Sequence, residues 1–194
     1  MLDDWLEGLR SAGGAAAPVW IELQASRLAD RGSKRSGPLP RADKLVAAWV
    51  RCLASAACGC PSDGIVIGEG AVVRVSAPDP DAALPLLLDL MRACREGLRG
   101  DEPLPTAVKT GSAWLSQPEK AAAVFEGQFN SPMPGEGKEA CLARLFPDFA
   151  SLRAQPQFDA ASRRLYQPLL EWLQRDVSVQ LLEAEPAAQD AADD

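Results

Sequence analysis

Residues 18–25, PVWIELQA, have the clearest strand pattern in this chain of 194 residues. Their side chains alternate between two sets, which is the period of two expected of a strand with one buried face. Val19, Ile21 and Leu23 form one set, and Trp20, Glu22 and Gln24 form the other. A polar loop with glycines and prolines follows from Arg27 to Pro40. The stretch therefore predicts one strand of a half-buried sheet.

The segments after this loop indicate a mixed α/β fold. Residues 42–57 have the strongest helical periodicity, and the runs 65–67 and 71–75 flank Gly68-Glu69-Gly70 as in a β-hairpin. Further helices are predicted over residues 79–100, 116–129, 139–146 and 157–174, whereas residues 101–116 are expected to be extended. We expect a small sheet of at most three or four strands, flanked by helices and completed by segments outside the chain, and a helical C-terminal half.

Two of these helices have features that fix their expected orientation or start. The helix at 79–100 has an apolar stripe at helical spacing, formed by Leu84, Leu87, Leu88, Met91, Cys94 and Leu98. The helix at 116–129 is expected to begin with a capping box formed by Ser116 and Glu119.

The sequence divides into three parts. Residues 1–17 are expected to be a helical segment ending near Leu9 and a small-residue linker, and residues 18–176 the folded domain. Residues 177–194 form an acidic tail with no basic residue, which is expected to be disordered. A chain that begins on a short helical segment suggests a start inside a larger architecture.

The composition excludes several kinds of catalytic site. The chain has 20 basic and 27 acidic residues, a net charge of −7, and no histidine. Without histidine there is no Ser-His-Asp or Cys-His nucleophile system and no histidine-containing zinc site. The acidic balance also argues against a domain that binds DNA through net charge alone.

The cysteines and the hydropathy favour a cytoplasmic protein. Five cysteines, an odd number, in a chain with adequate core material are typical of reduced thiols. Cys58-Gly59-Cys60 is too tightly spaced for a usual zinc site, and no cofactor is expected. No stretch approaches the roughly 18 apolar residues of a membrane span. Asp3 and Asp4 are unlike the basic start of a signal peptide.

Basic residues are concentrated between Arg27 and Arg51 in an otherwise acidic chain. Seven basic and two acidic residues give this stretch a local net charge of +5. Two interpretations stay open, a solvated surface or a contact with a nucleic-acid backbone or an acidic partner. The candidate contact residues are Arg27, Arg31, Lys34, Arg35, Arg41 and Lys44, together with Lys109 from a later segment.

Glu22 and Gln24 occupy the positions that an acid and a lysine take in a metal-dependent nuclease strand. There the carboxylate binds Mg²⁺, and the lysine two residues later helps to orient the attacking water. Gln24 has no charge, and no preceding strand is predicted that would supply a second carboxylate. Lys109 also lacks an acid two residues earlier, where Ala107 stands. The motif is therefore expected to be degenerate, with no catalytic residue and no metal.

A series of segments, in a fixed order, resembles one known family. The second half supplies PLPTAVKTGSAWL (103–115), KAAAVFEGQF (120–129), LARLFPDFASL (142–152) and FDAASRRLYQPLLEWL (158–173). The first half supplies the strand at 18–23, KLVAAWVRCLASAA (44–57) and LPLLLDLMRACREGL (84–98). Together they resemble the C-terminal domain of the gamma subunit of exodeoxyribonuclease V, the RecC chain of the RecBCD helicase–nuclease. The resemblance covers roughly residues 18–173.

The resemblance implies a degenerate restriction-endonuclease-like core that does not cut DNA. In active relatives an acid-x-Lys strand precedes a long helix, and here Glu22-Leu23-Gln24 precedes the helix at 42–57. The implied partners are RecB- and RecD-like subunits, the remainder of a RecC chain, and DNA within the complex. The implied role is assembly and DNA-strand guidance during recombinational repair of double-strand breaks. Strand splitting and Chi recognition are not carried over from the resemblance, because the family segments that would host them are absent from this sequence.

Two alternatives to this role stay open. One is a weak Mg²⁺-dependent nuclease that uses Glu22, which would cut single-stranded DNA and lose that activity in Glu22→Ala. The other is a free-standing interaction domain without a role on DNA. Co-purification with a helicase partner distinguishes the family role from this second alternative.

Overall fold

The computed structural model describes residues 7–11, 18–32, 37–99, 104–128 and 134–182. A five-stranded mixed sheet is formed by β1 (Leu9–Arg10), β2 (Val19–Leu23), β5 (Asp63–Gly68), β6 (Ala71–Val75) and β7 (Val177–Leu181). A separate two-stranded ribbon pairs β3 (Ala29–Asp30) with β4 (Leu39–Pro40). The helices are α1 (Ala42–Ala57), α2 (Pro80–Arg99), α3 (Val108–Ser116), α4 (Ala121–Glu126), α5 (Ala140–Leu145), α6 (Phe149–Arg153) and α7 (Phe158–Arg175). This confirms the mixed α/β prediction and the helical C-terminal half.

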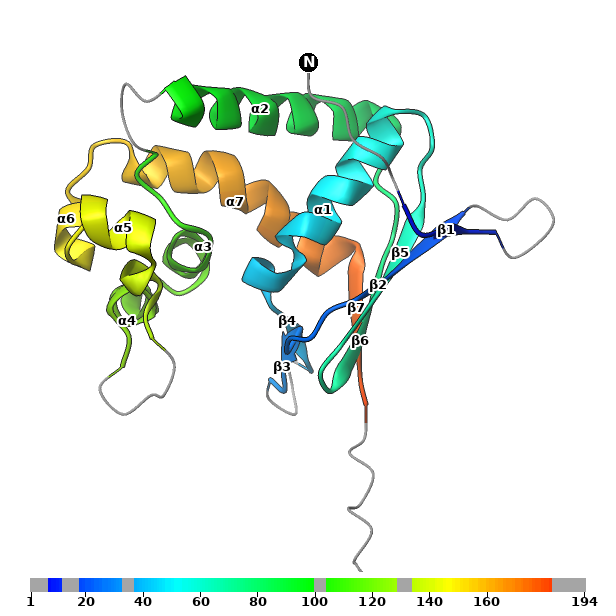
Figure 1. The fold of residues 1–194 in the computed structure, drawn as a ribbon, viewed down its shortest axis with the longest axis horizontal. Helices are drawn as coiled ribbons and strands as arrows, with labels where there is room; N and C mark the ends of the chain where they lie inside the picture. The colour runs from blue at the N-terminus through cyan, green and yellow to red at the C-terminus, as the bar shows by residue number, and fades with distance from the viewer. Residues whose placement is uncertain (1–6, 12–17, 33–36, 100–103, 129–133, 183–194) are drawn as a thin grey trace, which may run out of the picture.

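The sheet has the strand order β1-β2-β5-β6-β7. β2 and β5 are parallel, because α1 connects them across one face, and the other neighbours are antiparallel. Figure 1 shows α1 and α7 on one side of the sheet, with α2 lying over both, while no helix of the described chain covers the other side. The sheet therefore has one buried and one open face.

The buried face of β2 carries Trp20, and the aliphatic side chains of this strand lie on the open face. Trp20 is fully buried, whereas Ile21 and Leu23 point to the open face and are 46% and 77% exposed. Gly64 lies opposite Trp20 in the β2–β5 pair, and a Cβ at this position would overlap the indole ring. Residue 64 is therefore glycine because the tryptophan occupies the space of its side chain.

Two hydrophobic clusters hold the fold together. The larger lies between the sheet and helices α1 and α7, and includes Trp20, Leu45, Trp49, Val66, Val73, Leu169 and Trp172. The smaller joins the short helices to the start of α7 through Phe125, Phe146, Leu152 and Phe158. Burial of such large apolar side chains is the main term that favours folding.

Several predicted elements are confirmed by the structure. α1 spans the predicted residues, the hairpin at 65–75 forms β5 and β6, and α2 and α7 end within two residues of their expected limits. The predicted inward side chains of α7, Phe158, Leu165, Leu169 and Trp172, are buried. Within the described ranges, no helix is long and apolar enough to cross a lipid bilayer.

The two edges of the sheet were not predicted. Leu9 lies in strand β1 and not in a helix, and residues 1–6 of the expected helical segment lie outside the described residues. Residues 177–181, assigned to a disordered tail, form β7 against β6. The sheet therefore has five strands in place of the three or four expected, and its two outermost strands come from this chain. The rest of the expected tail, from residue 183 onwards, lies outside the described residues.

Two expectations for helical segments and one for a loop were also wrong. The segment expected to be extended up to residue 116 contains α3, and Ser116 donates its hydroxyl to Ser112 O instead of capping a later helix. Along α2, the deeply buried side chains are Ala83 and Ala93, whereas Leu84, Leu88, Met91, Cys94 and Leu98 of the predicted stripe are exposed. The loop at 27–40 contains β3 and β4, so it is partly ordered by pairing.

Candidate functional site

The carboxylate of Glu22 is engaged by two side chains, although it lies on the buried side of β2. Arg51 Nη1, from the middle of α1, donates to Oε2 over 3.2 Å. Gln24 Nε2 donates to Oε1 over 2.8 Å. Both oxygens are therefore occupied from within the chain, one of them by a positive charge.

Arg51 reaches this position because its guanidinium lies over the indole of Trp20. The guanidinium carbon is 5.0 Å from the ring centroid, a distance suited to a cation–π interaction. The side chains of Arg51 and Glu22 are 30% and 25% exposed, so the ion pair is partly shielded from water. The Glu22 carboxylate and the Trp20 ring therefore both orient the guanidinium of Arg51, and the ion pair holds the carboxylate in place.

No second carboxylate joins Glu22 to form a metal site. Asp63 is on the neighbouring strand β5, but it pairs with Val19 and points to the open face, while Glu22 points to the helices. Asp63 Oδ1 instead accepts the backbone N–H of Ala77 over 2.9 Å. Among the residues that the structure describes, no group of three or more cysteine, aspartate or glutamate side chains could hold a metal ion.

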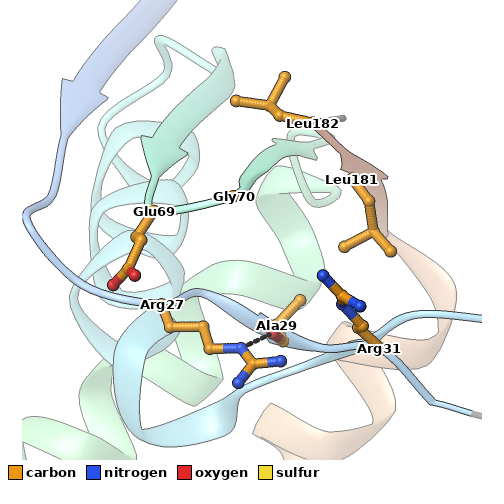
Figure 2. Close-up of a pocket in the computed structure, with 7 residues that line it drawn as sticks. All are labelled: Arg27, Ala29, Arg31, Glu69, Gly70, Leu181 and Leu182. Atoms are coloured by element: carbon orange, nitrogen blue, oxygen red, sulfur yellow. Dashed lines mark hydrogen bonds between the residues drawn. The ribbon is translucent and has the colours of Figure 1, made fainter. Parts of the chain in front are cut away.

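Two of the predicted contact residues, Arg27 and Arg31, line one open groove of about 1000 Å³. Figure 2 shows both guanidinium groups within this groove, with Leu181 and Leu182 of the β7 end on its opposite rim. Arg27 Nε donates to Ala29 O over 3.2 Å, which leaves its two terminal amino groups for other acceptors. The groove therefore combines two cations with an apolar rim.

The groove also contains one acidic side chain. Glu69, in the turn between β5 and β6, points towards Arg27 in Figure 2. This turn and the end of β7 were not predicted to belong to a site. Only the sheet pairing brings them next to residues 27–31, so the local sequence has no signal for them.

Arg41 and Lys109 line a second cavity of about 570 Å³ between α1 and the pair α3–α4. Asp30 of β3 also lines this cavity, while Ala29 and Arg31 line the first, so the β3–β4 ribbon lies between the two. Lys120, which was not predicted as a contact, is the third cation of its lining.

The cations at the start of α1 are paired within the chain. Asp43 Oδ2 lies 3.1 Å from Arg41 Nη2 and 3.7 Å from Lys44 Nζ. A paired guanidinium or ammonium group is a weaker attractor for an external anion. Lys34 and Arg35 lie outside the described residues. The structure thus brings Arg27 and Arg31 together in one groove, and separates them from Arg41, Lys44 and Lys109.

Glu136 lines the second cavity and caps the start of α3. Its buried carboxylate accepts the backbone N–H groups of Lys109 and Thr110 over 2.9 and 2.7 Å, and the Thr110 hydroxyl over 2.7 Å. α3 has no side-chain cap from its own N-cap residue, Ala107. A distant glutamate therefore supplies the cap and a negative charge at the positive end of the helix.

The thiols are not part of a catalytic arrangement within the described chain. Burial raises the pKa of Cys52, on α1, to about 12, so this thiol stays protonated at neutral pH. The four remaining cysteines, Cys58, Cys60, Cys94 and Cys141, are exposed and free.

The sequence of this chain matches one protein-family model. The family model of the RecC C-terminal domain matches residues 1–119, more than half of the chain. The chain belongs to the RecC C-terminal domain family. The match covers β1 to α3, and thus the Glu22 site and both arginines of the groove. The resemblance to RecC noted for the segments at 120–173 lies beyond the matched range. A search of curated proteins gave no match.

Membership relates the chain to the gamma subunit of RecBCD, the complex of exodeoxyribonuclease V, which is concerned with DNA repair and recombination. The strand compared above with an acid-x-Lys motif has the sequence Glu22-Leu23-Gln24. In this RecC C-terminal domain the glutamate is held by Arg51.

Proposed function

We propose that this domain is a non-catalytic part of the RecBCD gamma subunit that acts in assembly of the complex and in guidance of a DNA strand. The single observation that carries the non-catalytic part is the ion pair between Glu22 and Arg51. A metal-dependent nuclease needs free carboxylate oxygens that meet at one point to bind Mg²⁺. Glu22 has no acidic neighbour in the described sheet and is neutralised by a guanidinium.

The contact with a DNA strand is proposed for the groove of Arg27 and Arg31. Both side chains are exposed and lie on one wall of an open groove. Guanidinium groups donate hydrogen bonds to phosphate oxygens, and such contacts hold a strand without reading its sequence. The apolar rim formed by Leu181 and Leu182 would exclude water beside the phosphates. Lys34 and Arg35, in the β3–β4 connection, extend the same basic stretch in sequence.

We propose that the domain acts in the cytoplasm on broken DNA. Its proposed partners are RecB- and RecD-like subunits and the remainder of a RecC chain. Family membership supports this setting, because the family is defined by a domain of RecC. The net charge of −7 supports a role inside a complex, since an acidic chain gains little attraction for DNA from its overall field.

The test measures binding of a fluorescent single-stranded oligonucleotide to the full chain at several salt concentrations. We compare the wild type with Arg27→Ala/Arg31→Ala and with a matched control, Arg74→Ala/Arg144→Ala. The control removes two other exposed arginines that have no ion pair in the described structure. For two lost phosphate contacts on a single strand, the slope of log affinity against log salt should fall by about 1.4. In the control variant this slope should fall by less than it does in Arg27→Ala/Arg31→Ala.

Three results would each contradict a part of the proposal. Equal losses in the two variants would show that the groove is not the contact and that only net charge matters. Absence of salt-dependent binding, combined with retained co-purification with the other subunits, would leave assembly as the role and remove strand guidance. Cleavage of the oligonucleotide in Mg²⁺ or Mn²⁺, abolished by Glu22→Ala, would overturn the non-catalytic part.

A further inference from the structure

The groove of Arg27 and Arg31 lies beside the last described residue of the chain. Leu181 and Leu182 line the groove, together with Gly70 of the turn between β5 and β6. Leu182 N donates to Gly70 O over 2.9 Å, which holds the backbone of residue 182 at the rim. Figure 2 shows the Arg31 side chain extended towards Leu181. The residue that follows Leu182 therefore starts at the groove itself.

The two cations of this groove have no partner carboxylate among the described residues. Both arginine side chains are exposed, and none of the ion pairs of the described chain includes either of them. Glu69 also lines the groove, but it forms no ion pair with Arg27 or Arg31. The groove therefore has an excess of positive charge that the described chain does not neutralise.

The sequence after Leu182 carries the opposite charge. Residues 183–194, EAEPAAQDAADD, contain five carboxylate side chains and no basic residue, and they lie outside the described residues. We call them the acidic segment. Its first two acids are Glu183 and Glu185, and Pro186 favours an extended backbone at the residue before it. In an extended continuation of β7, side chains 183 and 185 share the side of Leu181, which lines the groove.

We infer that the acidic segment occupies the groove when no DNA strand is bound, with Glu183 and Glu185 paired to the two guanidinium groups, and that a strand displaces it. Exposed ion pairs are individually weak, but a short tether gives the segment a millimolar effective concentration at the groove. A strand displaces it because a row of phosphates releases more counterions than two carboxylates do. The inference rests on the proposed function, because that function places the strand in the groove.

A second copy of the chain fits the groove less well as the source of these carboxylates. Its acidic segment has the same sequence, but it lacks the tether that Leu182 provides at the rim. Two net charges of −7 also repel each other as the copies approach. The intramolecular contact is therefore favoured, and it is independent of the protein concentration.

Two variants of the full chain with equal charge test the contact. The near variant, Glu183→Gln/Glu185→Gln, removes the two carboxylates next to the groove. The far variant, Asp193→Asn/Asp194→Asn, removes two carboxylates eight or more residues further along the same segment. Both raise the net charge by two and alter no described residue, so the melting temperature should stay close to that of the wild type.

The first arm of the test observes the groove without DNA. Side-chain Nε–H signals of the arginines are recorded by nuclear magnetic resonance on the labelled full chain at low ionic strength. The near variant should shift the signals of Arg27 and Arg31, and added NaCl should move the wild-type signals in the same direction. The far variant should shift them much less. The signals of Arg74 and Arg144, which are exposed and lie outside the groove, should stay in place in both variants.

The second arm measures the affinity of the full chain for a fluorescent single-stranded oligonucleotide. The near variant should bind at least about threefold more tightly than the wild type, because the strand no longer competes with Glu183 and Glu185. The far variant should gain less than about twofold, since it changes only the general field. In the background of Arg27→Ala/Arg31→Ala the near and far substitutions should give equal gains.

The two arms separate failure of the inference from failure of the proposed function. If no form of the chain binds the oligonucleotide, strand guidance fails, and the first arm alone decides whether the acidic segment occupies the groove. If the wild type binds and the near and far variants gain equally, strand guidance stands and the inference fails. Unchanged signals of Arg27 and Arg31 in the near variant would also overturn it. Signal shifts that depend on protein concentration would assign the contact to a second copy, which contradicts the inference.

Discussion

Arg51 of α1 and Glu22 of β2 form an ion pair of 3.2 Å across the helix–sheet interface. The guanidinium supplies a fixed positive charge, but it cannot exchange a proton at neutral pH or activate water as a metal does. The site therefore retains a carboxylate on the strand and uses it to connect the strand to the helix.

Placing a lysine at position 24 should not produce cleavage. Gln24→Lys recreates the acid-x-Lys order, but the described sheet provides no second carboxylate beside Glu22, and Arg51 still holds it. We expect no cleavage of single-stranded or plasmid DNA by Gln24→Lys in Mg²⁺ or Mn²⁺. Cleavage that appears in this variant and vanishes in Glu22→Ala/Gln24→Lys would refute this prediction.

Removing Arg51 should destabilise the domain. Arg51→Ala loses the pair with Glu22 and the contact with the Trp20 ring, and leaves a half-buried carboxylate without its cation. We expect the free energy of unfolding to fall by about 1–2 kcal/mol in urea titrations. Arg163→Ala is the matched control, because its pair with Asp159 is more exposed and within one helix, and its loss should lower the free energy of unfolding less than the loss of Arg51 does.

Removing the Glu136 carboxylate should loosen α3. Glu136→Ala leaves the N–H groups of Lys109 and Thr110 and the Thr110 hydroxyl without their acceptor in a buried setting. A loss of about 2–3 kcal/mol in unfolding free energy is expected. Hydrogen exchange should show faster exchange at residues 109 and 110 than in the wild type. Glu119→Ala, at an exposed position of the neighbouring turn, should leave both measurements nearly unchanged.

Residue 64 should accept no side chain. A Cβ in Gly64→Ala would overlap the indole of Trp20, which lies in the fully buried core and has no room to move aside. We expect a lower melting temperature, with a loss of more than about 2 kcal/mol. Gly97→Ala is the control: nothing lies near its Cβ position on α2, so it should be neutral or stabilising by up to about 1 kcal/mol. Similar behaviour of the two variants would contradict the close packing at Gly64.

The buried thiol should make stability fall at alkaline pH. Burial raises the pKa of Cys52 from 9.0 to about 12 in the folded chain. Between these values the unfolded chain loses the proton and the folded chain keeps it, so the unfolded state is favoured progressively as the pH rises. The stabilisation is complete below pH 9 and is lost towards pH 12. Unfolding free energies of the wild type should therefore decline more steeply over this range than those of Cys52→Ala.

Periodicity predicted the elements well but not the side of an element that is buried. The limits of α1 and of the β5–β6 hairpin follow from local spacing and turn residues, which are properties of the segments themselves. On β2 the aliphatic side chains face outward because Trp20 fills the space above Gly64, and this depends on a strand 44 residues later. On α2 the small residues Ala83 and Ala93 face inward, since the helices pack closely there, while Leu84, Leu88 and Leu98 lie at the surface.

The site was predicted only in the parts that depend on single residues. The absence of a lysine at position 24 is visible in the sequence, and so is the basic stretch that contains Arg27 and Arg31. Arg51 and Glu22 are 29 positions apart, and nothing local indicates that they meet. The prolines at 103 and 105 favoured an extended segment, whereas α3 begins soon after them with a cap from Glu136, 27 positions from Lys109.

The outermost strands of the sheet, β1 and β7, lie at the two extremes of the described chain. During translation the hairpin of β5 and β6 leaves the ribosome long before residues 177–181 are made. The free edge of β6 therefore stays unpaired while about a hundred further residues are synthesised, until β7 pairs with it. The nascent protein depends on its last described strand to finish a sheet whose centre was synthesised about a hundred residues earlier.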